Sequence, residues 1–385
     1  MRWDSLRLQP DGAGGPPPAG PAPPALFGTD AVARTFDRPG FRGITFYEVR
    51  ARSIINQVPP ASRMAFRWTI NPYRGCSHGC VYCFARHTHT YLDLDAGLDF
   101  NSKIIVKVNA PELARRELGS ARWPGEHVAM GTNVDCYQRA EGRYRLMPGI
   151  IGALRDAGNP FSILTKGTLI LRDIDLLADA AQVTDVGINV SVGFVDKELS
   201  RCVEPGTPGP ARRLGVCAAL TARGLACGVL MGPVLPFLSD SPAQLKATVE
   251  QIAQAGANHV TPIVLHLRPG AREWFMTWLR MHHPGLVSSY LSLYGSGAYA
   301  PKAYQRRIAD QVRELAAASG IGNASPAQAR GASPAQARKA SPAQARGASP
   351  AQARGAGPRH PACRPGDRLA DGPADRPPAV QLSLL

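Results

Sequence analysis

The sequence is poor in acidic residues and has no long apolar run. Its 385 residues contain 29 Asp and Glu but 44 Lys and Arg, which gives a formal net charge of +15 at pH 7. A membrane-spanning helix needs roughly 20 mostly apolar residues, so we expect no membrane contact. The excess of positive charge favours a polyanionic partner such as nucleic acid, although charge alone supports only non-specific attraction.

The sequence also lacks a secretory signal peptide and a disulfide framework. Three of its eight cysteines fall in one short stretch, and the other five are scattered. We therefore expect a cytoplasmic protein, in a compartment that keeps thiols reduced. The scattered cysteines are Cys136, Cys202, Cys217, Cys227 and Cys363.

Both ends of the chain have compositions that cannot form a packed core. Residues 1–30 are rich in Pro, Gly and Ala, and we expect a flexible arm there. Within residues 321–385, the repeat Ala-Ser-Pro-Ala-Gln-Ala-Arg-Gly recurs four times, with Lys339 replacing one Gly. A proline at every eighth position would interrupt any helix, so we predict a disordered basic tail. We expect residues 31–320 to form the folded domain.

Within that domain, predicted strands alternate with predicted helices. This order predicts an α/β fold with a parallel sheet, whose strands end at a common edge where a site would lie. Strands are expected at residues 65–70, 104–108, 127–131, 161–164, 186–192, 225–231 and 259–265. Helices are expected at residues 84–94, 111–118, 148–157, 173–181, 210–223, 241–256 and 271–280.

The stretch from Asn71 to Cys83 places three thiols at the spacing C-x3-C-x2-C. Thiolates are soft ligands that suit iron–sulfur clusters and zinc. A [4Fe–4S] cluster usually takes four cysteines, so three would leave one iron open to an outside ligand. The alternatives are a zinc site, with His78, His87 or His89 as the fourth ligand, and three buried cysteines with no shared role.

The pattern C-x3-C-x-aromatic-C, with Tyr82 as the aromatic residue, resembles the signature of radical S-adenosylmethionine (SAM) proteins. The resemblance implies that Cys76, Cys80 and Cys83 hold a [4Fe–4S] cluster and that SAM chelates the open iron. It further implies reductive cleavage of SAM to methionine and a 5′-deoxyadenosyl radical, with an electron donor such as ferredoxin or flavodoxin. The fold it implies is a partial (β/α)6 TIM-like barrel.

Further strings are similar to the subgroup that resembles spore photoproduct lyase: Asp135 to Glu141, Thr165 to Lys166 with Arg172-Asp173, and Glu204-Pro205. The SAM contacts that we expect from the resemblance are Tyr82, Thr132, Asn133, Asp135, Lys166, Ser191 and Glu204.

Several of these residues have structural alternatives. Asp135 and Glu141 could instead cap the next helix or pair with Arg143 or Arg145. Glu204 could form a salt bridge to Arg212. We expect Arg172 and Asp173 to be a structural pair.

Cys136 is the candidate hydrogen-atom donor of the predicted site. The lyase donates from a cysteine in this region, but Cys136 stands after the aspartate rather than before it. We favour the alternative, in which Cys136 is a small hydrophobic residue packed inside the barrel.

The chain ends in Gln381 to Leu385, which resembles the peptide that binds the bacterial sliding clamp. Three functions follow as hypotheses. The first is a radical SAM enzyme that acts on DNA, in lesion repair like the photoproduct lyases. The second is a radical SAM enzyme that modifies a peptide, a protein or a small molecule. The third is a zinc-bearing nucleic-acid-binding protein without catalysis.

Overall fold

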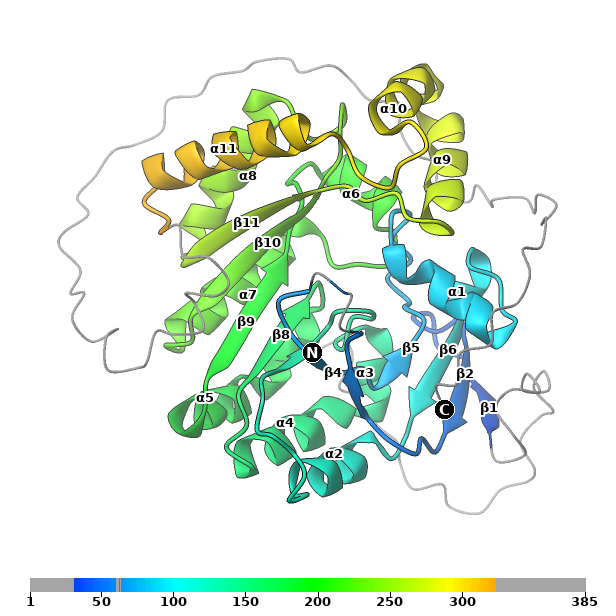
Figure 1. The fold of residues 1–385 in the computed structure, drawn as a ribbon, viewed down its shortest axis with the longest axis vertical. Coiled ribbons are helices and arrows are strands. Elements are labelled where there is room, and N and C mark those ends of the chain that lie inside the picture. Colours follow the sequence, from blue (N-terminus) through cyan, green and yellow to red (C-terminus); the bar gives the residue numbers. More distant parts are fainter. Residues whose placement is uncertain (1–30, 60–61, 63, 323–385) are drawn as a thin grey trace.

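A seven-stranded sheet forms the centre of the protein in the computed structural model, which describes residues 31–59, 62 and 64–322 (Figure 1). The strand order is β11-β10-β9-β8-β7-β4-β3. The six strands from β4 to β11 are parallel to their neighbours, and β3 pairs with β4 in the antiparallel direction. The strands are β3 (Ile55–Gln57), β4 (Trp68–Ile70), β7 (Val128–Met130), β8 (Phe161–Thr165), β9 (Val186–Ser191), β10 (Cys227–Val234) and β11 (His259–Val264).

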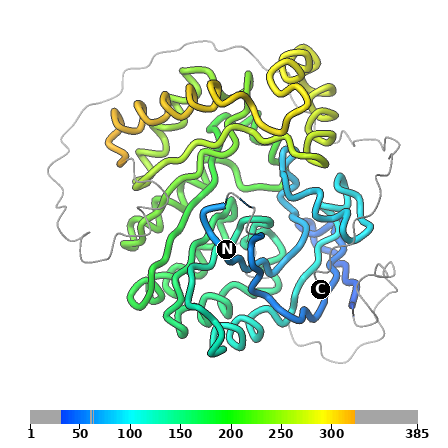
Figure 2. The backbone as a smooth tube through the Cα atoms, viewed as in Figure 1, coloured from blue at the N-terminus to red at the C-terminus, as the bar shows by residue number. Residues whose placement is uncertain are grey.

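A layer of helices covers the outer face of this sheet, as the tube in Figure 2 also shows. Along the chain, the helices from α2 to α8 lie between consecutive parallel strands of this sheet, as in right-handed crossovers, and α11 follows the last strand. The layer consists of α2 (Ala110–Leu118), α4 (Leu146–Asp156), η4 (Thr168–Asp173), α5 (Ile174–Val183), α7 (Pro210–Ala222), α8 (Pro242–Gln254) and α11 (Lys302–Ala318). The predicted α/β class and the six-stranded partial barrel are therefore confirmed.

A second sheet lies beside the barrel, with the order β1-β2-β6-β5. Its strands are β1 (Val32–Thr35), β2 (Thr45–Val49), β5 (Tyr73–Arg74) and β6 (Lys103–Lys107). The strand predicted at residues 104–108 belongs here, so its assignment to the barrel repeat was wrong. Because Ile104 and Val106 pack into the main core while Ile105 packs against Tyr47 and Leu94, its apolar pattern resembles that of a buried barrel strand.

The remaining helices lie in other connections between strands or follow β11. The segment predicted as a helix at residues 84–94 is the 3₁₀ helix η3 (Phe84–Leu92). The others are α1 (Leu98–Ser102), α3 (Arg139–Tyr144), α6 (Lys197–Val203), α9 (Ala271–His282), η5 (Pro284–Leu286) and α10 (Val287–Tyr294). The predicted arm (residues 1–30) and the tail from residue 323, with the clamp-like Gln381 to Leu385, lie outside the described residues.

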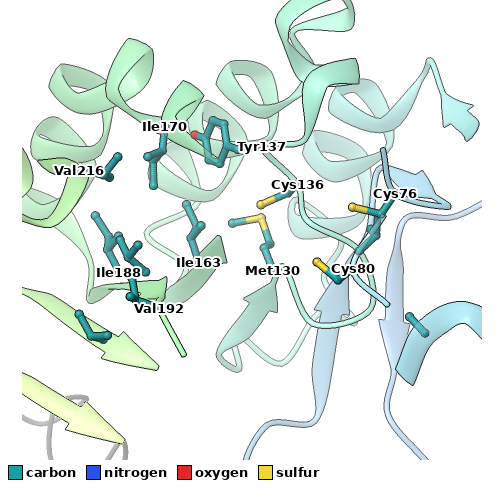
Figure 3. Close-up of a cluster of buried hydrophobic side chains, with 14 of the residues drawn as sticks. Cys76, Cys80, Met130, Cys136, Tyr137, Ile163, Ile170, Ile188, Val192 and Val216 are labelled. Atoms are coloured by element: carbon teal, nitrogen blue, oxygen red, sulfur yellow. The ribbon is translucent and has the colours of Figure 1, made fainter. Parts of the chain in front are cut away.

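The core between sheet and helices contains a row of side chains in register. Met130, Ile163 and Ile188 are directly paired across β7, β8 and β9, and all three are buried. Figure 3 shows Ile163 and Ile188 on the same side as Ile170 and Val216 of the helix layer. Each such side chain contributes about 1.5–3 kcal/mol by leaving water. None of the helices formed by the described residues has both the length and the apolarity needed to cross a bilayer.

Gly131 shows how tightly the sheet and its loops approach one another. Its φ is +81°, and an added Cβ would lie 1.8 Å from the carbonyl oxygen of Leu164 on the next strand. Gly125 has a similar φ of +68°, but an added Cβ there meets no atom within 4 Å. Comparing alanine substitutions at Gly125 and Gly131 therefore separates the free-energy cost of a left-handed backbone from the cost of the steric clash.

We predict that Gly125→Ala lowers the free energy of unfolding by about 1–2 kcal/mol, the cost of a left-handed alanine. Gly131→Ala should cost at least about twice as much, because the strand must also move. Urea denaturation of both variants measures the difference, and equal losses would contradict the clash.

Candidate functional site

The three-cysteine loop follows β5 of the second sheet rather than the barrel strand directly. Cys76 and Cys80 are buried and Cys83 is half-buried. Figure 3 shows Cys76 and Cys80 at the edge of the core near Met130. Gln138 ties the loop to the barrel, because its amide accepts from the Ser77 N–H (2.9 Å) and donates to the Gly75 carbonyl (2.9 Å).

The segment from Val203 to Gly206 holds the other side of the cysteine loop. The Val81 N–H donates to the Val203 carbonyl (3.0 Å), and the Gly206 N–H donates to the His78 carbonyl (2.9 Å). An added Cβ on Gly206 would lie 2.1 Å from the Ser77 carbonyl oxygen. Only glycine therefore allows this close approach of two backbones, a role that the sequence string Glu204-Pro205-Gly206 did not reveal.

Glu204 lies fully buried in a network below the cysteine loop. Its carboxylate accepts from the Tyr82 hydroxyl and from the Arg213 guanidinium, and Ser200 Oγ lies 3.4 Å away. Burial acts to raise the pKa of Glu204, but the charges of Arg213 and Lys166 and the hydrogen bonds from Tyr82 and Arg213 together outweigh burial, and the pKa is lowered. The predicted salt bridge was to Arg212, which is exposed; the helix α7 presents Arg213 instead.

Lys166 and Ser191 meet at the carboxyl ends of β8 and β9. Lys166 Nζ donates to Ser191 Oγ at 2.8 Å, and Ser191 Oγ donates to the Gly232 carbonyl at 3.0 Å. The same ammonium lies 5.8 Å from the centre of the Tyr82 ring. Three of the predicted SAM contacts are therefore gathered around one positive charge next to the cysteine loop.

The carboxylate of Asp135 accepts hydrogen bonds from neighbouring residues. It accepts from Thr165 Oγ1 (2.7 Å), from the Lys166 N–H (2.6 Å) and from the Tyr137 N–H (2.9 Å). His78 Nδ1 lies 3.4 Å from its second oxygen.

Asp135 thus joins the cysteine loop to the end of β8. It neither caps α3 nor pairs with Arg143 or Arg145. The neighbouring Thr132 is half-buried and Asn133 is exposed.

Glu141 is buried among structural partners. Tyr73 donates to it (2.5 Å), as do the Leu146 N–H (3.0 Å) and Arg172 Nη2 (2.7 Å). Glu141 therefore caps the start of α4 through the Leu146 and Met147 N–H groups, which was one of the two expectations, while its ion-pair partner is Arg172 of η4 rather than Arg143 or Arg145. Arg172 also pairs with Asp173 at 2.7 Å, as expected for a structural pair.

Cys136 is fully buried in the main core. Burial raises the pKa of its thiol well above the usual range. Figure 3 draws its sulfur next to Met130 and Tyr137, within the apolar cluster. This environment is that of a packing residue.

Arg86 is a site residue that sequence reasoning missed. It lies on η3, is fully buried, and donates to the carbonyls of Gly79 (3.2 Å) and Cys80 (2.9 Å) inside the cysteine loop. Burial lowers its pKa, and the thiols of Cys83, Cys80 and Cys76 act to raise it. Its only sequence signal is its place three residues after Cys83, which does not separate it from a surface arginine.

The histidines proposed as a fourth zinc ligand all have other partners. His87 Nδ1 lies 2.8 Å from the Phe84 carbonyl, and His89 Nε2 lies 2.9 Å from the Lys103 carbonyl. Among residues 31–59, 62 and 64–322, no group of three or more His, Cys, Asp or Glu side chains is arranged to hold one metal ion. A zinc ion needs several ligands that converge on one point, whereas in an iron–sulfur cluster each cysteine binds a different iron. Three soft donors in one loop therefore fit a [4Fe–4S] cluster with one open iron.

Comparison with known proteins agrees with this site. A family model described as the Radical SAM superfamily matches residues 70–261, which include the cysteine loop, Lys166, Ser191 and Glu204. An uncharacterized protein of Mycobacterium tuberculosis, Rv2578c, is 52% identical over 286 residues, covering 74% of this chain and 84% of the relative. The uncharacterized protein MJ0683 of Methanocaldococcus jannaschii is 25% identical over 197 residues, covering 51% of this chain and 70% of the relative.

Among solved structures, the fold is similar to that of spore photoproduct lyase. The lyase complexed with dinucleoside spore photoproduct has a TM-score of 0.53 and 13% identity, covering 70% of this chain and 78% of that chain. A mutant of the lyase with bound AdoMet and the same dinucleoside also has a TM-score of 0.53, at 14% identity, covering 70% of this chain and 77% of that chain. At this identity the likeness concerns the fold alone.

The buried carboxyl of Glu141 gives a pH dependence that can be measured. Burial raises its pKa to about 7, although Arg172 acts in the opposite direction. The folded state therefore holds this proton more tightly than the unfolded chain does. The resulting stabilisation is present below about pH 4.3 and is lost as the pH rises through about 7.

We predict that the free energy of unfolding of the wild type falls relative to Glu141→Gln between about pH 5 and about pH 7. The expected change is on the order of 1–3 kcal/mol. Urea unfolding of both proteins across this range tests it, and a difference that stays constant with pH would show that Glu141 titrates normally.

Proposed function

Because the chain belongs to the radical SAM superfamily, whose members use a [4Fe–4S] cluster and SAM, we propose that it is a radical SAM enzyme that acts on nucleic acid. The observation that carries the proposal is the meeting of the cysteine loop with Lys166 and Ser191 at the strand ends. This edge is where parallel α/β folds place their sites.

We propose that Cys76, Cys80 and Cys83 bind the cluster and that SAM lies between the loop and the ends of β7 to β10. When bound, the reduced cluster would supply the electron for reductive cleavage of SAM. An electron donor such as ferredoxin or flavodoxin would then reduce the cluster again. Within this site, Lys166 offers its ammonium to the carboxylate of SAM, and the Ser191 hydroxyl orients Lys166. We expect Thr132 and Asn133, which follow β7, to contact the amino group of SAM.

Two of the expected SAM contacts act differently in this proposal. The oxygens of Glu204 are already taken by Tyr82 and Arg213, so it positions the Tyr82 ring rather than binding the ribose. Asp135 accepts from Thr165 and from the backbone of Lys166, so it fixes the place from which Lys166 reaches into the site. Both are positioning residues.

The nucleic-acid substrate is supported first by charge. The net charge of +15 would draw a phosphate backbone toward the protein. The fold of a lyase that binds a dinucleoside photoproduct is compatible with a nucleic-acid lesion as substrate, and DNA repair is the role we propose. An enzyme that acts on a base inside a duplex must first turn the base out of the stack.

Aromatic side chains at the strand ends give the second support. Phe237 follows β10 with a φ of +64°, a conformation that bulky residues rarely adopt, and its side chain remains 44% exposed. Asp240 holds this turn by accepting from the Phe237 N–H at 2.7 Å. Strain of this kind collects at functional sites, and an exposed aromatic ring can stack on a base.

A second aromatic group follows β11. The Tyr299 ring lies 4.6 Å from that of His266, and its hydroxyl accepts from Arg268 at 3.0 Å. Tyr299 is 48% exposed. Together with Phe237 it places planar and cationic groups at the carboxyl ends of two neighbouring strands, as single-stranded nucleic acid requires.

The cofactor assignment predicts separable losses. Anaerobically reconstituted Cys80→Ala should lack the full cluster and should produce no 5′-deoxyadenosine from SAM and dithionite. Lys166→Met should keep its iron but bind SAM at least about tenfold more weakly, because a charge-assisted contact is lost. Iron and sulfide analysis with isothermal titration of SAM measures both effects.

Lys197→Met, which removes an exposed lysine at the start of α6, is the control for charge. Deoxyadenosine formation by Cys80→Ala, or zinc in place of iron in the wild type, would refute the assignment.

The substrate assignment predicts weaker binding when the exposed ring is removed. Phe237→Leu should raise the dissociation constant for a single-stranded oligonucleotide at least about fivefold, since base stacking contributes about 1–3 kcal/mol per base. Leu291→Ala on α10, which removes another exposed apolar side chain, is the matched control and should change nothing. Fluorescence anisotropy at two salt concentrations measures both, and equal affinity of Phe237→Leu and wild type would count against nucleic acid at these strand ends.

A further inference from the structure

The buried guanidinium of Arg86 is bound entirely by neutral acceptors. Besides the carbonyls of Gly79 and Cys80, it donates to those of Ala96 (3.1 Å) and Gly97 (2.7 Å) and to Asn101 Oδ1 (3.0 Å). Its Nε also donates to the Cys80 carbonyl at 3.1 Å. These bonds satisfy its N–H groups without supplying any negative charge.

Two aromatic rings enclose the same guanidinium. Its central carbon lies 5.2 Å from the centre of the Phe100 ring and 4.8 Å from that of Trp274 on α9. Trp274 can approach so closely because Gly97 has no side chain, and a Cβ there would lie 2.4 Å from the indole. The rings exclude water, so the positive charge is shielded neither by solvent nor by counter-ions.

A buried charge without a partner is costly, so proteins pair such charges or place them beside a metal centre. In the described part of the chain, Arg86 forms no ion pair within 4.0 Å. The charge of Asp95 acts to raise the pKa of Arg86, but the Asp95 carboxylate forms no ion pair with it and accepts from the Gly97 N–H (2.9 Å). The three cysteines of the loop that Arg86 binds supply negative charge when their thiols are deprotonated to hold a cluster.

We propose that Arg86 is the counter-charge of the iron–sulfur cluster and sets its reduction potential. The proposal rests on the assignment of Cys76, Cys80 and Cys83 as cluster ligands. One-electron reduction by an external donor adds one negative charge to the cluster and leaves the protein otherwise unchanged. A fixed cation beside it stabilises the reduced form more than the oxidised form, so Arg86 raises the potential.

The test is a redox titration of the reconstituted protein, followed by electron paramagnetic resonance. Arg86→Gln, which keeps hydrogen-bond donors but removes the charge, should shift the reduction equilibrium toward the oxidised cluster by at least about tenfold, which is about 59 mV for one electron. Arg86→Lys keeps the charge and should stay close to the wild-type potential. Asn101→Leu removes one hydrogen bond to the guanidinium without changing charge, and should also leave the potential unchanged.

The outcomes separate the proposal from the cofactor assignment. A wild type without a cluster would refute the assignment itself. A wild type with a cluster whose potential is the same in Arg86→Gln would overturn the role of Arg86 alone. If Arg86→Gln assembles no cluster, Arg86→Lys decides. A cluster near the wild-type potential supports the counter-charge, and loss of the cluster overturns it, because the guanidinium would then act through its hydrogen bonds to the loop.

Discussion

The buried ion pair between Glu204 and Arg213 is the interaction on which the site depends. Glu204 also accepts from Tyr82, one residue before the last cysteine of the loop, while Arg213 donates to the Ser191 carbonyl at 2.8 Å. One pair therefore links the loop, the end of β9 and the helix α7. Removing either partner would leave an uncompensated buried charge, a loss on the order of 3–5 kcal/mol. A change that breaks this ion pair would therefore disturb both the position of the cysteine loop and the stability of the barrel.

Electrostatics at the site follow from the parallel order of the strands. Because β8 and β9 end side by side, Lys166 and Ser191 meet without any dedicated loop. Lys166 approaches the cysteine loop from the barrel, and the buried Arg86 contacts the loop from η3. Two cations therefore flank a loop of three thiols, which fits a group that carries net negative charge.

The sequence predicted the parts of this protein whose physical cause is local. Cysteine spacing, the order of strands and helices, and the position of Lys166 at a strand end can all be read along the chain. Partnerships across the fold could not be: Arg213 and Arg212 are equivalent until α7 is oriented, and the strand at 104–108 has the apolar pattern of either sheet. Arg86 could not be predicted, because its role depends on carbonyls and rings that come from four separate segments.

The contact between Arg86 and Trp274 joins the first third of the domain to its last strand–helix unit. Trp274 is almost two hundred residues downstream of the cysteine loop, on α9 after β11. During synthesis the loop leaves the ribosome long before the indole that closes over its arginine. The enclosure of Arg86 by Trp274 can therefore form only after almost the whole barrel has been synthesised.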